Sequence, residues 1–196
     1  MFDVRRAECV VLDASVLINL VATDIADAIL AAMGRPCVVT DDALREVKRC
    51  PRGRSNGEHP AASLLASSRL QEVLLSDAER ELFFGLVGAA PPDDLDDGEA
   101  ASIACAHFRN GIIVLDERKA RRIAREQFPS LLVLSSVDLF VNALESGVVE
   151  LVLMRQAVRD AMHYSRMRVL AEQKPWVASL IDAEGKSLGR AAESKG

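Results

Sequence analysis

Short apolar runs alternate with segments of helical periodicity along most of the chain. Each apolar run is brief and uninterrupted by polar residues, which is typical of a strand buried on both faces of a sheet. Such strands are predicted at residues 10–12, 37–39, 70–75, 112–115 and 131–134. Helical segments between consecutive strands indicate crossover connections. We therefore predict an α/β fold with a mainly parallel sheet of four or five strands.

Helices are predicted where apolar residues recur at helical spacing behind a capping residue. Residues 76–79 have the sequence of a capping box, which opens a helix to about residue 87. The other short helices are predicted at residues 16–21, 25–33, 42–49, 60–68, 98–109, 117–127 and 136–144. A long amphipathic helix is predicted for residues 149–173. Pro175 and the glycines after it predict a weakly structured tail.

Two of the predicted strands end at an aspartate. Asp13 follows the first strand and Asp116 follows the fourth. Because the carboxyl ends of parallel strands share one edge of a sheet, both side chains are expected at the same crevice. A buried carboxylate there is unfavourable unless something compensates its charge.

Two glutamates lie on predicted helices that can pack over this crevice, Glu46 and Glu99. Four carboxylates brought together repel one another unless a cation holds them. Mg²⁺ or Mn²⁺ suits a site built only of oxygen ligands. Such an ion binds phosphate oxygens and activates water, which indicates metal-assisted cleavage of phosphodiesters.

Composition narrows the functional classes. The chain has 196 residues, a net charge of −5, an isoelectric point near 5.3 and 4% aromatic residues. This acidity argues against a nucleic-acid binder that works through bulk positive charge, and the few aromatics argue against a base-stacking platform. We expect a domain at residues 1–150 and a helical extension at residues 151–196.

Four cysteines without CxxC spacing, and no apparent N-terminal signal segment, predict reduced thiols and a cytoplasmic location. No apolar run approaches 18 residues, so no membrane span is expected.

Four segments together resemble PIN-domain nucleases. They are VVLDASVLINL at 10–20, ALREV at 43–47, LDDGEAASIACA at 95–106 and IIVLDERKARRIA at 112–124. The resemblance covers roughly residues 8–155 and is nearest to a bacterial branch with an LDxGEA motif, which is related to the VapC-like toxins of toxin–antitoxin pairs. It implies a parallel sheet with helices on both faces, and endoribonuclease activity that depends on Mg²⁺ or Mn²⁺.

The resemblance also implies roles for individual residues. Asp13, Glu99 and Asp116 match the metal-binding carboxylates of the family. Glu46 matches a fourth catalytic position that completes the metal site or places a water. Each has a structural alternative: a helix cap for Asp13, a solvated side chain for Glu46 and a favourable charge at a helix N-terminus for Glu99.

Further residues are expected to support the site or bind substrate. Ser15 and Asn19 match polar positions that would orient Asp13. The helix after Asp116 is crowded with basic side chains, of which Arg118, Arg121 and Arg122 are predicted to hold the RNA backbone near the metal. The alternative is a charged helix face in solvent. Arg52 and Arg54, on a turn-rich loop, are predicted to act in the same way.

The sequence leaves the partners and the activity itself open. The C-terminal helices carry apolar residues that one small domain does not cover, which predicts a homodimer or a groove for an antitoxin. One rival is a catalytically inactive PIN-fold module that binds RNA or protein. Another is a phosphoacceptor or phosphatase domain, for which Ser135 and Ser136 are the hydroxyl candidates near the site.

Overall fold

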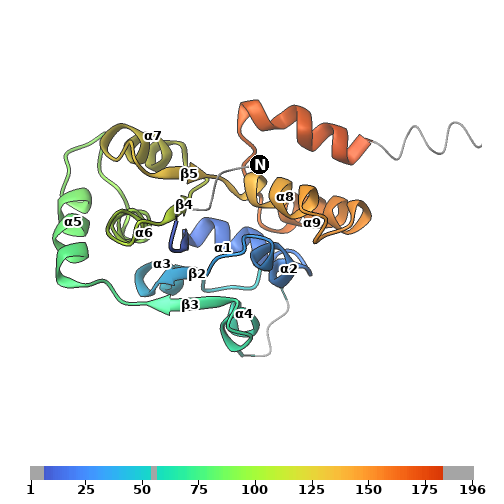
Figure 1. Ribbon diagram of the computed structural model, residues 1–196, viewed down its shortest axis with the longest axis horizontal. Helices are drawn as coiled ribbons and strands as arrows, with labels where there is room; N and C mark the ends of the chain where they lie inside the picture. The colour runs from blue at the N-terminus through green and yellow to red at the C-terminus, as the bar shows by residue number, and fades with distance from the viewer. Residues whose placement is uncertain (1–6, 54–56, 183–196) are drawn as a thin grey trace, which may run out of the picture.

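A computed structural model describes residues 7–53 and 57–182 (Figure 1). Its strands are β1 (Val10–Leu12), β2 (Cys37–Thr40), β3 (Leu70–Val73), β4 (Ile112–Val114) and β5 (Leu132–Leu134). They form one sheet in the order β3-β2-β1-β4-β5, and every neighbouring pair is parallel. The predicted α/β fold with a parallel sheet is confirmed.

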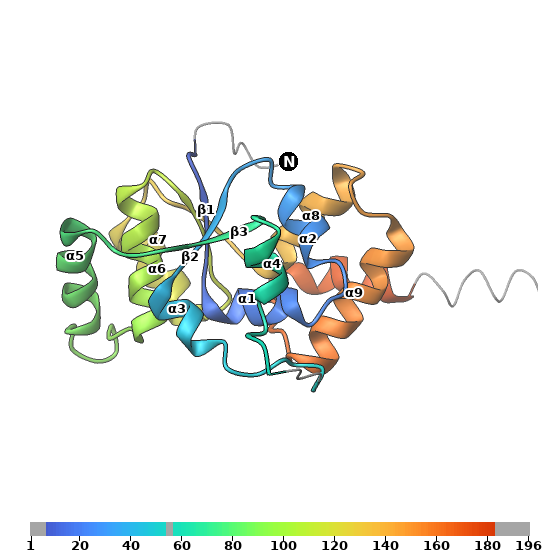
Figure 2. The same ribbon diagram turned by 90° about the horizontal axis from the view of Figure 1, so that it is seen from below.

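The helices alternate with these strands, as the sequence predicts. They are α1 (Ala14–Val21), α2 (Ala26–Ala31), α3 (Asp41–Glu46), α4 (Ala62–Ala66), α5 (Asp77–Val87), α6 (Asp97–Phe108), α7 (Arg118–Gln127), α8 (Ser136–Glu145) and α9 (Leu151–Tyr164). Helices α5, α6 and α7 cover one face of the sheet, whereas α1, α2, α8 and α9 cover the other (Figure 2).

Two hydrophobic cores form because strand side chains alternate between the faces of the sheet. In β1, Val10 and Leu12 enter the core beneath α1 and α8, while Val11 enters the core beneath α6. All three valine and leucine side chains are fully buried. The uninterrupted apolar sequence of β1 follows from this burial on both sides.

The order of the strands reverses at the centre of the sheet. From β1 the chain runs outward to β2 and β3, and then continues with β4 and β5 on the other side of β1. In open parallel sheets a ligand crevice forms at such a reversal, beyond the carboxyl ends of the strands. Asp13 directly follows β1, and Asp116 lies two residues beyond β4.

Two predicted boundaries are wrong. The third strand ends at Val73, and the long helix predicted to residue 173 stops at Tyr164. Arg166 has a left-handed backbone (φ 56°), and the Met167 N–H bonds to the Ala161 carbonyl at 3.1 Å. This turn ends the helix because it buries the Met167 side chain in the core, at 6% exposure.

The segment after this turn is ordered further than the sequence predicts. Residues 171–173 form a short 3₁₀ helix and residues 174–182 form an α-helix. Pro175 is compatible with it because the N–H groups of a first helical turn have no intrahelical acceptor. The remainder of the predicted weak tail, residues 183–196, lies outside the described residues.

The C-terminal segment shares its core with the sheet. Met154 and Val158 of α9, together with Met167 and Leu180, belong to the same hydrophobic cluster as β1. The division into residues 1–150 and 151–196 stays a prediction. Cys9, Cys37 and Cys105 are buried, and all four cysteines are free thiols. In the described parts of the chain, no helix has the length and apolar character needed to cross a bilayer.

Candidate functional site

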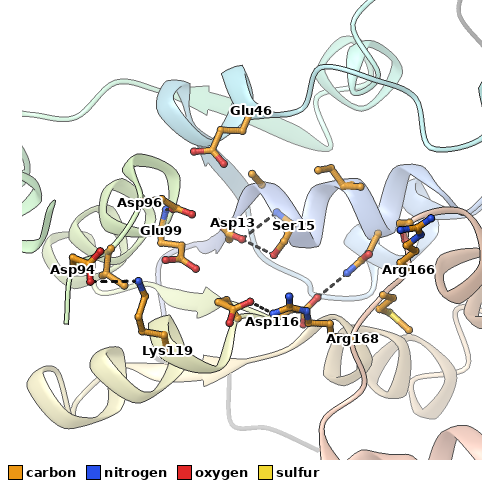
Figure 3. A pocket seen from close by; sticks show the side chains of 17 residues that line it. Asp13, Ser15, Glu46, Asp94, Asp96, Glu99, Asp116, Lys119, Arg166 and Arg168 are labelled. Carbon is orange, nitrogen blue, oxygen red and sulfur yellow. Dashed lines mark hydrogen bonds and ion pairs between the residues drawn. The ribbon is translucent and has the colours of Figure 1, made fainter. Parts of the chain in front are cut away.

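The predicted catalytic carboxylates line one pocket of about 700 Å³ at the reversal point of the sheet. We call it the acidic pocket. Its carboxylates are Asp13, Glu46, Asp94, Asp96, Glu99, Asp116 and Glu117. Figure 3 shows Asp13, Glu46 and Glu99 reaching this space from three separate elements. Residues more than 100 positions apart in the sequence therefore meet here, as the strand pattern predicts.

Asp13 caps α1 and is held by Ser15. Its Oδ2 accepts hydrogen bonds from the Ser15 N–H at 3.0 Å and from the Ser15 hydroxyl at 2.6 Å. The side chain is buried, and burial raises the pKa of Asp13 to about 6 although the Ser15 hydrogen bonds oppose this. A hydrogen bond from the Ala14 backbone opposes the rise as well. The capping and supporting contacts predicted for Asp13 and Ser15 are thus both present.

Asp116 is fixed by two side chains from the α1 and α8 side. Its Oδ1 accepts the Ser136 N–H at 2.8 Å, and its Oδ2 accepts the Ser136 hydroxyl at 2.6 Å and the Asn19 amide at 2.7 Å. Burial raises the pKa of Asp116, and these hydrogen bonds limit the rise. The expectation that Asn19 orients Asp13 is wrong, because Asn19 lies more than one turn further along α1, beside Asp116.

Glu99 enters the acidic pocket from α6. It lies in the first turn of α6, whose cap Asp96 accepts the Glu99 N–H at 2.9 Å. Burial, and then the charges of Asp96 and Asp13, raise the pKa of Glu99 to about 7, while Lys119 opposes this rise. A hydrogen bond from the Asp96 backbone also opposes the rise. With a pKa of about 7, the Glu99 carboxyl group takes up a proton or a cation near neutral pH.

Glu46 enters the pocket from α3 and contacts the start of α6. Its Oε1 accepts the Gly98 N–H at 2.9 Å. A Cβ atom on Gly98 would lie only 2.5 Å from that oxygen, so the contact requires a residue without a side chain. Burial and the charge of Asp96 raise the pKa of Glu46. The glycine of the GEA segment is explained by this close approach of Glu46.

The carboxylates of the acidic pocket fit a hard divalent cation, because all of their donor atoms are oxygens and the pKa values of Asp13, Glu46, Glu99 and Asp116 are raised. As the side chains are placed, however, no three His, Cys, Asp or Glu residues within the described chain are grouped closely enough to hold one ion. The metal-binding roles of Asp13, Glu99 and Asp116 stay predictions.

Sequence reasoning missed several residues of this site. Asp96 acts as the cap that the sequence favours, but its charge also acts on Asp13, Glu46 and Glu99. Ser136 follows β5, so it shares the edge of the sheet on which Asp116 lies, and this position was the available signal. The arginines at positions 166 and 168 line the pocket from the segment after α9.

The three predicted substrate-binding arginines have different environments. Arg121 is buried, and its Nη1 donates to the Leu115 and Leu134 carbonyls at 2.7 and 2.6 Å. It joins the ends of β4 and β5, so this part of the guanidinium is not free to bind substrate. Arg122 is exposed and pairs with acidic neighbours. Arg118 is exposed, and no acidic side chain in the described chain pairs with it. All three line a second pocket, of about 680 Å³.

Arg52 does not act as predicted. Its guanidinium binds the Asp160 carboxylate, the Asp24 carboxylate at 2.8 Å and the Ala22 carbonyl at 2.8 Å, and lies 5.1 Å from the centre of the Tyr164 ring. Three of its five N–H donors are thus bound within the protein and the side chain is only 11% exposed, so little of it is available to a phosphate. Its partner in the prediction, Arg54, lies outside the described residues.

Comparison with known proteins indicates the family of this chain. A sequence model of the family described as PIN domain matches residues 9–178. No curated protein matches the chain. Among solved structures, a chain in the crystal structure of VapBC2 from Rickettsia felis, bound to a DNA fragment from their promoter, is similar at 14% identity with a TM-score of 0.44. The alignment covers 65% of this chain and 98% of that one.

Proposed function

The chain belongs to the PIN domain family, and we propose that it is a metal-dependent endoribonuclease, the VapC-like toxin of a type II toxin–antitoxin pair in the cytoplasm. PIN domains are generally nucleases and typically use divalent metal ions. The observation that carries the proposal is the acidic pocket, in which carboxylates from β1, α3, α6 and β4 gather. Buried like charges of this kind are stable together only with protons or a cation.

Each side chain has a defined task in this proposal. Mg²⁺ or Mn²⁺ bound by Asp13, Glu99 and Asp116 would supply Lewis-acid activation of water and neutralise phosphate charge. Ser15 holds the Asp13 carboxylate in one orientation. Glu46, anchored by the backbone at the start of α6, is placed to accept a proton from an attacking water.

Asp116 is positioned from the other side of the pocket. Ser136 and Asn19 supply three hydrogen bonds to its carboxylate, which fixes the residue that must face the ion. These donors favour the ionised form, and thereby keep Asp116 available as a ligand although it is buried. Asn19 and Ser136 are therefore positioning residues in the proposal.

Binding of Mn²⁺ is expected to weaken about tenfold when the pH falls from 8 to 6. Glu99 has a pKa of about 7 and Asp13 of about 6, so both take up protons in this range and the ion must displace them. Titration calorimetry of the purified protein with MnCl₂, in two buffers of different ionisation enthalpy, measures the affinity and the protons released.

Asp116→Asn is the matched variant, since it removes one charge and retains a similar shape. It is expected to lose most of the Mn²⁺ affinity at pH 8. Equal affinity in the variant and the wild type, or an affinity independent of pH, would show that the ion binds elsewhere.

A catalytically inactive PIN-fold module that binds RNA or protein is the second candidate. It is favoured by the spacing of the carboxylates, of which no three in the described chain lie ready to share one ion. The same calorimetry separates the two, because an inactive module has no need of a pH-dependent Mn²⁺ site. A protein that binds RNA but neither Mn²⁺ nor Mg²⁺ would be assigned to this class.

We also propose that α9 forms an interface with a second copy or with an antitoxin. Leu151, Val152 and Leu153 at its start are 50%, 69% and 51% exposed. Adjacent exposed aliphatic side chains of this size commonly mark a protein interface. Size-exclusion chromatography with light scattering should find a dimer, or a complex with the product of the adjacent gene. A protein that stays monomeric and does not bind that gene product would contradict the proposal.

A further inference from the structure

The second pocket, which we call the basic pocket, lies between α7 and the segment 168–174. Its cationic residues are Arg118, Arg121, Arg122, Arg125, Arg168 and Lys174. Its acidic residues are Asp116, Glu126 and Glu172. An overall acidic chain thus concentrates positive charge at one concave position. Such a local field attracts an anionic ligand regardless of the net charge of the protein.

Only two of these six cations, Arg122 and Arg168, form an ion pair with an acidic side chain in the described chain. Arg118, Arg125 and Lys174 are exposed, and no carboxylate in the described chain pairs with them. Burial, and then the charge of Arg125, lower the pKa of Arg121, while Asp138, Asp116 and Glu172 oppose this shift. Exposed cations that have no paired carboxylate therefore lie on both walls of the pocket, on α7 and on the C-terminal segment, as expected of a binding site for phosphates.

The basic pocket adjoins the acidic pocket. Asp116 and Arg168 line both, so a polymer that reaches the carboxylates can continue between α7 and the C-terminal segment. Arg168 also pairs with Glu117, on the rim of the acidic pocket. None of the described residues that line the basic pocket is aromatic, which favours contact with a backbone over stacking of bases.

We propose that the basic pocket binds the phosphate backbone of the single RNA strand beside the scissile bond, with Arg125 and Lys174 gripping it from opposite walls. The identity of the polymer rests on the proposed function. The C-terminal segment beyond α9 thereby becomes part of the substrate site, and recognition there is independent of base sequence. A concave pocket favours a single strand over a duplex, which needs a broad open surface.

The test is RNA binding by the double variant Arg125→Gln/Lys174→Gln, made in the Asp13→Asn background and measured in EDTA so that no strand is cut. Fluorescence anisotropy with a mixed-sequence 12-nucleotide RNA reports the Kd at several salt concentrations. Loss of two phosphate contacts is expected to raise the Kd about tenfold and to reduce the slope of log K against log salt by about 1.4. In the otherwise wild-type enzyme, KM should rise while kcat stays the same.

Arg69→Gln is the control, because it removes a positive charge by the same kind of substitution beside β3, at the opposite edge of the sheet from α7. It should change neither the Kd nor the salt slope. Equal binding by the double variant, or equal competition from an acidic peptide of the same charge, would overturn the proposal. So would a duplex RNA that binds as tightly as the single strand.

The experiments distinguish failure of the basic-pocket proposal from failure of the proposed nuclease function. If the protein cuts RNA but its double variant keeps the wild-type Kd and KM, the nuclease proposal holds and the basic-pocket proposal fails. A protein that binds RNA through these residues but never cuts it would do the reverse.

Discussion

Replacing Asp13 with asparagine is expected to reduce RNA cleavage by about 1000-fold or more while the protein remains folded. A charged ligand to a catalytic metal contributes several kcal/mol to the stabilisation of the transition state, and each 1.4 kcal/mol is about a factor of ten in rate. The asparagine oxygen can still accept both hydrogen bonds from Ser15, so α1 retains its cap. Cleavage of a labelled RNA in the presence of MgCl₂ measures the loss.

The stability of the same variant should change in the opposite direction. The folded-state pKa of Asp13 is about 6, above the ordinary 3.8, so the folded protein binds this proton more tightly than the unfolded chain does. Without metal, the wild type therefore loses stability as the pH rises from about 4 to 7, on the order of 3 kcal/mol for this group. Asp13→Asn avoids that loss, and its metal-free melting temperature at pH 8 should equal or exceed that of the wild type.

Asp27→Asn is the matched control, since this carboxylate is exposed on α2, and its only described ion pair, with Arg69, is equally exposed. It should leave both cleavage and stability unchanged. An Asp13→Asn protein that cuts RNA at the wild-type rate would sink the metal-site assignment. A variant that melts well below the wild type at pH 8 would instead identify Asp13 as a structural cap.

Replacing Arg52 with methionine is expected to lower the melting temperature by about 10 °C. Arg52 and Asp160 are each only 11% exposed, and the pair ties the loop after α3 to α9. Removing one partner of a buried ion pair leaves the other charge without compensation, which costs about 3–5 kcal/mol. For a chain of this size, each kcal/mol corresponds to roughly 2–4 °C. Thermal unfolding followed by circular dichroism measures the shift.

Arg69→Met provides the comparison, because its pair with Asp27 is half exposed on both sides and contributes little. Its melting temperature should stay within a degree or two of the wild type. Below its own melting temperature, Arg52→Met should retain full cleavage and an unchanged KM. A raised KM with unchanged stability would restore the phosphate-binding role that the sequence predicts for Arg52.

The parts of the fold that follow from short-range patterns were predictable. Apolar runs marked the strands, and helical segments between them required parallel crossovers. Because parallel strands end at a common edge, Asp13 and Asp116 were predicted to lie together although they are 103 positions apart. The roles of Glu46 and Glu99 were assigned from the family resemblance, because the sequence of a helix does not show against which element the helix packs.

The errors have a common physical origin in contacts made only in the folded state. Asn19 contacts Asp116 because α8 brings Ser136 beside it, and no local pattern in α1 encodes that neighbour. Arg121 has the sequence context of an exposed charged helix, yet its Nη1 donates to the carbonyls that end two strands. Helical periodicity likewise continues past Tyr164, and only the burial of Met167 ends α9 there.

The missing side chain at position 98 gives the site a narrow tolerance. The Glu46 carboxylate packs directly against the Gly98 backbone at the start of α6, where a β-carbon would lie only 2.5 Å from Oε1. Such a carbon would suit the helix itself, which forms more readily with alanine than with glycine. The helix itself therefore has no need of glycine at this residue, and the close approach of Glu46 is the contact that explains it. A natural Gly98→Ala variant would therefore fold normally, but its Glu46 carboxylate would be displaced from the pocket.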